Sequence, residues 1–309
     1  MKIAIVTDKL ARSDGQSRVN LEIAKYALAQ GHQLALISVV AAQELLDAGA
    51  EWLPIRPFVK RPYLFKMLSS VRAANAILKA RKGDFDVVLG NGYTMSCPHE
   101  VNSAHHVHGA SLPIYAANNG TGPYAWYQHC YHMFNARKEQ VAFASAKTVV
   151  AVSDKVRAEL IKIGVPENKI RVIYNGVDTK EFCPGIENRG ELGLPEAKPL
   201  ALFVGDIRTK GKNLDTVLKA LVHVPEMSLA VAGALPGSPF PAMAQSLGLG
   251  ERVRFLGFRR DVSRLMRACD LFVFPSRYEA GSLVILEALA SGLPVITART
   301  AGGCEVMTA

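Results

Sequence analysis

The sequence predicts a doubly wound α/β protein built from two Rossmann-like domains, and three observations lead to this fold class. Short apolar runs rich in Val and Ile alternate with helical patterns along the whole chain. These runs are continuously apolar, as is typical of parallel strands that are covered on both faces. The length of 309 residues suits two domains of about 150 residues each.

The strands and helices are expected to alternate in chain order. The expected strands are residues 2–8, 34–40, 86–90, 100–106, 148–153, 170–174, 201–206, 228–233, 253–257, 271–275 and 294–298. The expected helices are residues 18–30, 67–81, 126–146, 154–163, 213–222, 239–247, 260–268 and 282–291. The Pro-, Gly- and charge-rich segment 178–199 interrupts the alternation, and a fresh strand follows it. We therefore expect an acceptor-binding domain over 1–190 and a short nucleotide-sugar-binding domain over 195–309.

Composition restricts the class of protein further. Hydrophobic residues make up 49% of the chain and charged residues 20%, which allows a large core and excludes a disordered or fibrous protein. The longest apolar runs are far shorter than the roughly 20 residues that span a bilayer, and no signal peptide is recognisable, so we expect a soluble, cytoplasmic protein. A disulfide framework or zinc site is not expected, because the cysteines are scattered without a C-x-x-C pair: Cys97, Cys130, Cys183, Cys269 and Cys304.

The formal net charge of +9 is concentrated in residues 56–82, which contain no acidic residue. Aromatic and aliphatic residues are interleaved with the basic ones there, namely Arg56, Lys60, Arg61, Lys66, Arg72, Lys79, Arg81 and Lys82. Such a segment suits contact with an anionic membrane surface, and an ordinary solvated helix is the alternative. Nucleic acid is not expected as a partner, because no nucleic-acid-binding motif accompanies the charge.

The loop after the first strand, residues 8–20, contains one glycine, Gly15. The dinucleotide fingerprint G-x-G-x-x-G is therefore absent, which argues against a nicotinamide cofactor. Gly15 lies just before an expected helix, where it would let a ligand approach free backbone N–H groups; a plain turn is the alternative.

The motif GDIRTKGKN (205–213) is close to a phosphate-binding P-loop, but its spacing is wrong by one residue and Asn213 replaces the Ser or Thr that holds magnesium. What remains is a strand end followed by Arg208, Lys210 and Lys212 ahead of a helix. These cations suit a diphosphate, and a solvated basic loop is the alternative.

The segment 275–305 carries two glutamates eight positions apart, Glu279 and Glu287. Gly281 and Ser282 open a helix between them. Both carboxylates are expected to face a ligand over the helix N-terminus, where they can accept hydrogen bonds from sugar hydroxyls or a ribose diol.

Taken together, these motifs resemble the family 4 glycosyltransferases, which are retaining enzymes of the GT-B fold. PSRYEAGSLVILEALASGLPVI resembles the family's paired-glutamate signature, and FVGDIRTKGKNLDTVLKAL (203–221) its diphosphate-binding strand, loop and helix. VIYNGVDTKEFCP (172–184), VRFLGF (253–258) and DLFVFPS (270–276) follow the family's order as well. The resemblance is strong from about residue 148 and looser before it.

The resemblance implies a role for each candidate residue. Arg208 and Lys212 would neutralise the diphosphate leaving group, although Asp206 stands where the family usually has its arginine. Glu279 would face the donor sugar. The remaining donor-binding residues would be Gly15, Gly205, Gly281, Ser282, Leu283 and Glu287, with Glu287 on the ribose.

The family's acceptor-side histidine corresponds to the segment VNSAHHVHG (101–109). His105 is the first choice, His108 the second and His106 the third. The three histidines also resemble a metal cluster, but partners at ligand spacing are lacking. Structural histidines are the remaining alternative.

The function implied is transfer of a hexosyl group from a UDP- or GDP-sugar to a hydroxyl acceptor with retention of configuration, without metal or other cofactor. The acceptor would be a saccharide or lipid-linked molecule of cell-envelope polysaccharide or glycolipid biosynthesis, reached from the cytoplasmic face of the membrane. Because residues 195–309 are short for such a domain, the C-terminus is expected to be truncated, and a catalytically silent nucleotide-sugar-binding module is the alternative.

Overall fold

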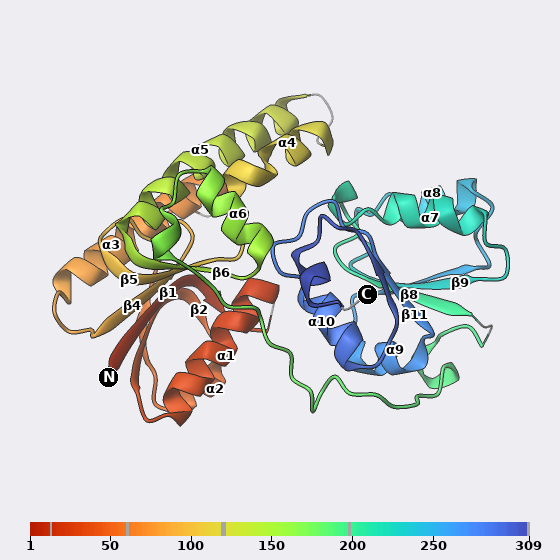
Figure 1. Cartoon of the computed structure of the whole chain (residues 1–309), viewed down its shortest axis with the longest axis horizontal. Coiled ribbons are helices and arrows are strands. Elements are labelled where there is room, and N and C mark those ends of the chain that lie inside the picture. The colour runs from red at the N-terminus through yellow and green to blue at the C-terminus, as the bar shows by residue number, and fades with distance from the viewer. Residues whose placement is uncertain (13, 60–61, 119–121, 197–198, 308–309) are drawn as a thin grey trace. The chain divides into compact units, whose positions relative to one another are not determined.

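The computed structural model describes residues 1–12, 14–59, 62–118, 122–196 and 199–307. The chain forms two compact units, Met1–Asn175 and Gly176–Ala309, which are coloured red to green and green to blue in Figure 1. Each unit has its own parallel β-sheet, as the sequence predicts.

The first unit contains a seven-stranded sheet with the order β3-β2-β1-β4-β5-β6-β7. Its strands are β1 (Lys2–Leu10), β2 (Gln33–Ala41), β3 (Glu51–Pro54), β4 (Val87–Asn91), β5 (His99–Ala104), β6 (Ala146–Ala151) and β7 (Ile170–Val172). Its α-helices are α1 (Gly15–Ala29), α2 (Gln43–Asp47), α3 (Tyr63–Ala80), α4 (His108–Asn118), α5 (Pro123–Ser145) and α6 (Asp154–Lys162).

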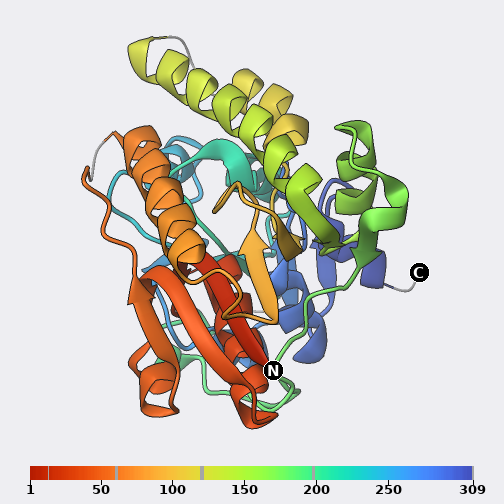
Figure 2. The same cartoon turned by 90° about the vertical axis from the view of Figure 1, so that its left-hand side faces the viewer.

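Successive residues of β1 serve opposite faces of this sheet. Ile5 packs with Leu21 of α1 in one core, whereas Ala4 and Val6 pack with Ala74 of α3 in the other. Figures 1 and 2 show α3 and α5 on the side of the sheet away from α1 and α2. Burial on both faces explains why the strand sequences are continuously apolar.

The second unit contains a five-stranded sheet with the order β10-β9-β8-β11-β12. Its strands are β8 (Leu200–Val204), β9 (Ser228–Ala232), β10 (Val253–Gly257), β11 (Leu271–Phe274) and β12 (Val295–Thr297). Its α-helices are α7 (Leu214–Val222), α8 (Phe240–Ser246), α9 (Val262–Ala268) and α10 (Leu283–Ala290). Phe203, Phe272 and Phe274 from the central strands lie within one large apolar core.

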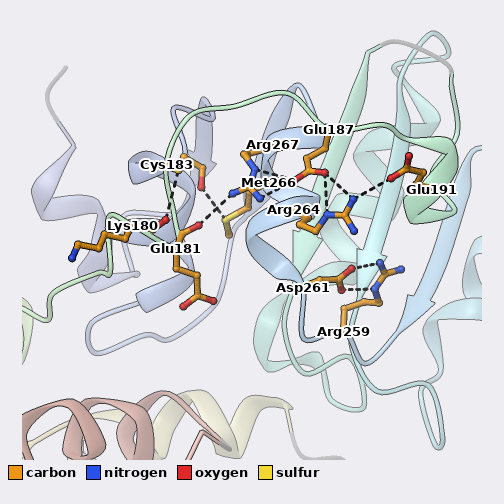
Figure 3. A network of polar contacts seen from close by, with 11 residues as sticks. Lys180, Glu181, Cys183, Glu187, Glu191, Arg259, Asp261, Arg264, Met266 and Arg267 are labelled. Carbon is orange, nitrogen blue, oxygen red and sulfur yellow. Dashed lines mark hydrogen bonds and ion pairs between the residues drawn. The ribbon is translucent and has the colours of Figure 1, made fainter. Parts of the chain in front are cut away.

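The segment after Asn175 packs with the second unit, whereas the sequence assigned residues up to 190 to the first domain. Phe182 is buried in the core of the second unit, and Arg189 forms an ion pair with Asp270 at 2.8 Å. Glu187 bridges Arg264 and Arg267 of α9, as Figure 3 shows. These contacts attach the segment to the second sheet although its composition resembles a linker.

Among the described strands and α-helices, three were not expected from the sequence. Strand β3 is an edge strand of four residues, and helix α2 has five residues, so both are too short for a hydrophobic period to identify them. Helix α4 contains Pro113, which argues against a helix in a sequence-based assignment. Among the described helices, none is long and apolar enough to cross a bilayer.

Candidate active site

Each sheet has one point where the order of its strands reverses, and open α/β sheets bind ligands beyond the carboxyl ends of the strands there. The reversal lies between β1 and β4 in the first unit and between β8 and β11 in the second. The predicted residues can therefore be compared with two defined places, one in each unit.

In the second unit, two predicted residues meet beside the ends of β8 and β11. The Lys212 ammonium forms an ion pair with the Glu279 carboxylate, and Ser276 Oγ donates to Glu279 Oε1 at 3.0 Å. Lys212 Nζ also lies 5.7 Å from the centre of the Phe274 ring, a cation–π contact. The pair thus fixes a cation and a carboxylate at the reversal point.

Gly205 follows β8 directly and lies in a closely packed turn. A Cβ on Gly205 would lie 3.3 Å from the Phe274 ring and 3.4 Å from Lys212 Cγ. Gly233, which follows the neighbouring strand β9, is tighter still, because its Cβ would lie 2.3 Å from the Gly205 carbonyl oxygen. Two glycines thus let two strand ends approach each other next to Lys212.

Arg208 does not join the Lys212–Glu279 pair. Its guanidinium donates to both carboxylate oxygens of Asp206, at 2.8 and 2.9 Å, and its side chain is 56% exposed. The hydrogen bond from Arg208 holds the pKa of Asp206 below its usual value. The charge of Arg208 is therefore largely balanced where it stands.

Gly281, Ser282 and Leu283 lie at the N-terminus of α10, and Ser282 is the N-cap residue of this helix. The Ser282 side chain makes no capping hydrogen bond, and the residue is 3% exposed. Glu287 is buried one turn into the same helix, at 6% exposure. The backbone of Glu279 also pairs with Ala301, which ties the glutamate loop to the chain beyond β12.

In the first unit, a cavity of about 190 Å³ lies at the ends of β1, β4 and β5. The lining includes all three candidate histidines, three tyrosines and several amides and hydroxyls. Polar groups gathered at a reversal point between parallel strands are typical of a ligand site. The lining residues that carry the chemistry are Asp8, Tyr63, Lys66, Ser70, Asn91, Tyr93, His105, His106, His108, Tyr131 and Glu139.

The three candidate histidines have different partners. His105 Nε2 lies 3.0 Å from Ser103 Oγ, His106 Nε2 lies 2.8 Å from Ser111 Oγ, and His108 Nδ1 lies 3.1 Å from His132 Nδ1. In the described part of the chain, no three metal-ligating side chains converge on one point. The histidines are instead arranged as hydrogen-bonding groups.

Burial keeps two of these imidazoles neutral near pH 7. It lowers the pKa of His105 to about 4, against a small opposing effect of Asp14. It lowers the pKa of His108 to about 3, and the neighbouring His132 adds to the effect. A neutral imidazole can accept a hydrogen bond from an acceptor hydroxyl.

Glu139 of α5 holds the start of α4 in place. Its two carboxylate oxygens accept hydrogen bonds from the backbone N–H groups of His108 and Gly109, at 3.0 Å each. Burial raises the pKa of Glu139 to about 7, although these two hydrogen bonds act in the opposite direction. The carboxylate caps a helix N-terminus and fixes the backbone that carries His108.

Gly15 is the first residue of α1, and the cap of this helix is already filled. Asp14 accepts hydrogen bonds from the backbone N–H and the hydroxyl of Ser17, both at 2.9 Å. Gly15 itself does not line the cavity, whereas the next residue, Gln16, does. The structure thus places Gly15 in the first unit and the other donor candidates in the second.

Sequence reasoning missed Asn91, Tyr131 and Glu139. Asn91 ends a strand whose apolar part was expected to stop at residue 90, so a polar residue at a strand's carboxyl end was a usable signal. Tyr131 and Glu139 lie on the long helix α5 and reach the cavity only through packing, which no local pattern reveals.

Two domains, each with a parallel sheet covered by helices, are the architecture of the GT-B fold, and solved glycosyltransferase structures share this fold. A solved structure of WaaG, a glycosyltransferase involved in lipopolysaccharide biosynthesis, matches 98% of this chain and 82% of its own with a TM-score of 0.79 and 24% identity. A structure of Anabaena HepE in complex with UDP-glucose covers 100% of this chain and 83% of the HepE chain, with a TM-score of 0.72 and 20% identity.

The chain belongs to glycosyltransferase family 4. The Glycosyltransferase Family 4 model matches residues 13–181, more than half of the 309 residues, and the Glycosyl transferases group 1 model matches residues 186–309. The D-inositol 3-phosphate glycosyltransferase of Mycobacterium tuberculosis is 34% identical over 175 residues. That match covers 53% of this chain and 36% of the relative's length.

Proposed function

We propose that this protein transfers a hexosyl group from a UDP- or GDP-sugar to a hydroxyl of a saccharide or lipid-linked acceptor, with retention of the anomeric configuration. The observation that carries the proposal is the Lys212–Glu279 pair at the strand reversal of the second sheet. It supplies one cation for a leaving diphosphate and one carboxylate for sugar hydroxyls. Family membership and the UDP-glucose bound to HepE support a nucleotide-sugar donor.

The proposed chemistry builds negative charge on the diphosphate as the anomeric bond breaks. Lys212 and the N–H groups at the start of α10 would stabilise that charge. Glu279 would orient the donor sugar. Gly205 would keep the turn small enough for the phosphates to approach the backbone, and Glu287 would hold the ribose. In the first unit, the neutral His105 and His108 would contact the acceptor.

A thermal-stability screen of the whole chain tests the donor. UDP-glucose, UDP-galactose, UDP-N-acetylglucosamine and GDP-mannose would be compared with NADH. A nucleotide sugar at one hundred times its Kd adds about 2.7 kcal/mol to the free energy of unfolding. Stabilisation by NADH alone, or by none of these compounds, would contradict the proposal.

Transfer itself is measured on the donor that binds. We expect a product whose anomeric proton coupling matches that of the donor sugar, and an inverted product would refute retention. Donor binding without any transfer or hydrolysis would instead favour the catalytically silent module, which the sequence left as the alternative.

We further propose that the first unit contacts an anionic membrane surface through residues 56–82. Phe58 is 91% exposed and Phe65 55% exposed. The basic residues of this segment do not act alike, because Lys66 is paired with Asp8 and Arg81 with Glu51. Lys60 and Arg61 lie outside the described residues. The exposed cations that would face lipid are Arg56, Arg72, Lys79 and Lys82.

Liposome flotation tests the membrane contact. Binding to vesicles containing anionic lipid should weaken as salt rises, because each near-surface cation contributes about 1 kcal/mol of screened attraction. Arg72→Glu should weaken binding, whereas Arg254→Glu, a charge reversal at an exposed position of the second unit, should not. Equal effects of the two variants, or binding that ignores salt, would exclude this surface.

A further inference from the structure

The residue that follows Lys212 has an unusual backbone conformation. Asn213 has φ 63° and ψ 31°, and among the described residues it is the only non-glycine residue with a positive φ. Asparagine tolerates this left-handed conformation better than most residues, but the conformation still costs free energy and persists only where the surrounding structure holds it. The contacts of Asn213 show what holds it.

The Asn213 side chain joins two loops that are far apart in the sequence. Its Nδ2 donates to the Pro275 carbonyl oxygen at 2.9 Å, and its Oδ1 accepts from Thr216 Oγ1 at 2.7 Å. The Pro275 carbonyl can only accept, so the NH₂ group of the amide must face it. Because Pro275 is the first residue after β11, this bond ties the loop of Lys212 to the loop of Glu279.

Further contacts hold the same two loops together. The Arg277 N–H donates to the Gly211 carbonyl at 3.1 Å, and Ser276 Oγ lies 3.2 Å from the same carbonyl oxygen. The Arg277 guanidinium donates to both carboxylate oxygens of Asp215, at 3.1 and 2.9 Å. The loop after β11 is therefore a fixed anchor for the Asn213 amide.

The Lys212 side chain needs such an anchor, because its ammonium lies at the end of a flexible four-carbon stem. The ammonium contacts Glu279 and lies 5.7 Å from the centre of the Phe274 ring. The backbone of Lys212 is the last residue of a short 3₁₀ turn, Lys210–Lys212, which Asn213 ends. A cation stabilises a developing charge best when it is in place before the reaction, so the backbone below it has to be held.

We infer that Asn213 is the positioning residue of Lys212: its hydrogen bond to the Pro275 carbonyl holds the Lys212 ammonium against Glu279 at the strand reversal. The position of the ammonium can be measured without any substrate. That this position serves a leaving diphosphate rests on the proposed function.

Side-chain NMR of the full chain with ¹³C-labelled lysine tests the position. The two Hε protons of an immobilised lysine have different chemical shifts, whereas those of a freely rotating lysine coincide. The Lys212 signal is assigned as the one missing from Lys212→Arg. We expect two separate shifts in the wild type that merge in Asn213→Gly, because glycine keeps the left-handed backbone but has no amide to bond Pro275.

Arg252→Met is the matched control for the loss of a side-chain bond to a backbone carbonyl. Arg252 precedes β10 at the amino ends of the strands, away from Lys212, and its guanidinium donates to the Val224 carbonyl at 2.8 Å. Both variants should lower Tm by about 2–8 °C, but only Asn213→Gly should merge the Hε shifts of Lys212. Merged shifts in the wild type, separate shifts in Asn213→Gly, or merging in both variants would overturn the inference.

Kinetics tests the link to catalysis, with release of UDP from UDP-glucose or of GDP from GDP-mannose as the measured reaction. Asn213→Gly should lower kcat about tenfold and change the KM for the donor less than about threefold, because a displaced charge is missed mainly in the transition state. In a Lys212→Ala background the same substitution should lower kcat less than about twofold, since the cation that it positions is gone. An equal loss in both backgrounds would show that Asn213 acts independently of Lys212, which contradicts the inference.

Failure of the proposed function has a different signature. The wild-type chain would then release neither nucleotide, while the Hε shifts of Lys212 would still merge in Asn213→Gly. Failure of the inference leaves nucleotide release by the wild type intact and leaves the Lys212 signal of Asn213→Gly unchanged.

Discussion

At the scale of single residues, Arg208 and Lys212, two of the three cations of the 205–213 loop, differ in a way that their sequence spacing does not reveal. Lys212 lies at the strand reversal and contacts Glu279. The Arg208 guanidinium instead donates two hydrogen bonds to the Asp206 carboxylate. A bidentate carboxylate partner leaves little of the Arg208 charge for a ligand. Lys212 is paired as well, so its position at the strand reversal is what makes it the better candidate for stabilising a diphosphate.

Lys212→Ala should lower kcat/KM for transfer by about 10²–10³-fold, as is typical for loss of one preorganised charge-stabilising group. Arg208→Ala should cost less than about tenfold, because Asp206 already balances this guanidinium. Steady-state kinetics on both variants, with circular dichroism to verify folding, make the comparison. An equal loss in the two variants would show that Asp206 releases Arg208 when the donor binds.

The buried titratable groups of the first unit make its stability depend on pH in two opposing ways. The pKa values of His105 and His108 are lowered to about 4 and about 3, so their contribution to stability is lost as pH falls below 6.5. The pKa of Glu139 is raised from 4.5 to about 7, so its contribution is lost as pH rises from 4.5 to 7. The two effects partly cancel between pH 4.5 and 6.5.

Glu139→Gln removes one side of this balance. The unfolding free energy of the variant should rise more steeply between pH 5 and 7 than that of the wild type. A shift of the Glu139 pKa from 4.5 to about 7 corresponds to a difference on the order of 3 kcal/mol across the whole titration. Urea unfolding at pH 5, 6 and 7 measures both slopes. Parallel slopes would mean that Glu139 titrates normally in the folded protein.

At the scale of elements, the close approach of two strand ends sets the shape of the 205–213 loop. The backbone after β8 and the backbone after β9 meet where Gly233 contacts the Gly205 carbonyl, and Gly233 N–H donates to the Gly257 carbonyl at 2.9 Å. A side chain at position 233 has no room, because the atom that it meets is backbone.

Gly233→Ala should therefore lower the free energy of unfolding by about 1–3 kcal/mol and weaken nucleotide-sugar binding together with it. Gly250→Ala is the control, since a Cβ there meets nothing within 4 Å and the backbone is not in the left-handed region. The control should be neutral or slightly stabilising. Thermal unfolding with and without donor compares them, and a neutral Gly233→Ala would show that the loop yields easily.

At the scale of the whole molecule, we expect each of the two units to fold by itself, and the boundary between them lies at Asn175–Gly176. The segment between this boundary and residue 195 contributes three buried side chains to the second core: Phe182, Leu192 and Leu194. It also supplies the ion pairs of Glu187 and Arg189. A fragment that starts after this segment loses all of these contacts.

We expect fragment 176–309 to unfold cooperatively, and fragment 195–309 to be markedly less stable. Each fully buried Leu or Phe contributes about 1.5–3 kcal/mol, so loss of three removes much of the stability of a single domain. Urea unfolding of the two fragments provides the comparison. Equal urea midpoints of the two fragments would place the boundary of the folded domain near residue 195, as the sequence predicts.

The sequence by itself determined the alternation of strands and helices, because burial on both sheet faces leaves a continuous apolar signature in each strand. It also predicted that Lys212 and Glu279 follow strand ends in the second domain, where the structure pairs the two side chains. Only the tertiary structure decided that Arg208 is balanced by Asp206 and that Glu139 caps the helix of His108. Hydrogen-bond partners depend on distances between segments far apart in the chain, which no local pattern records.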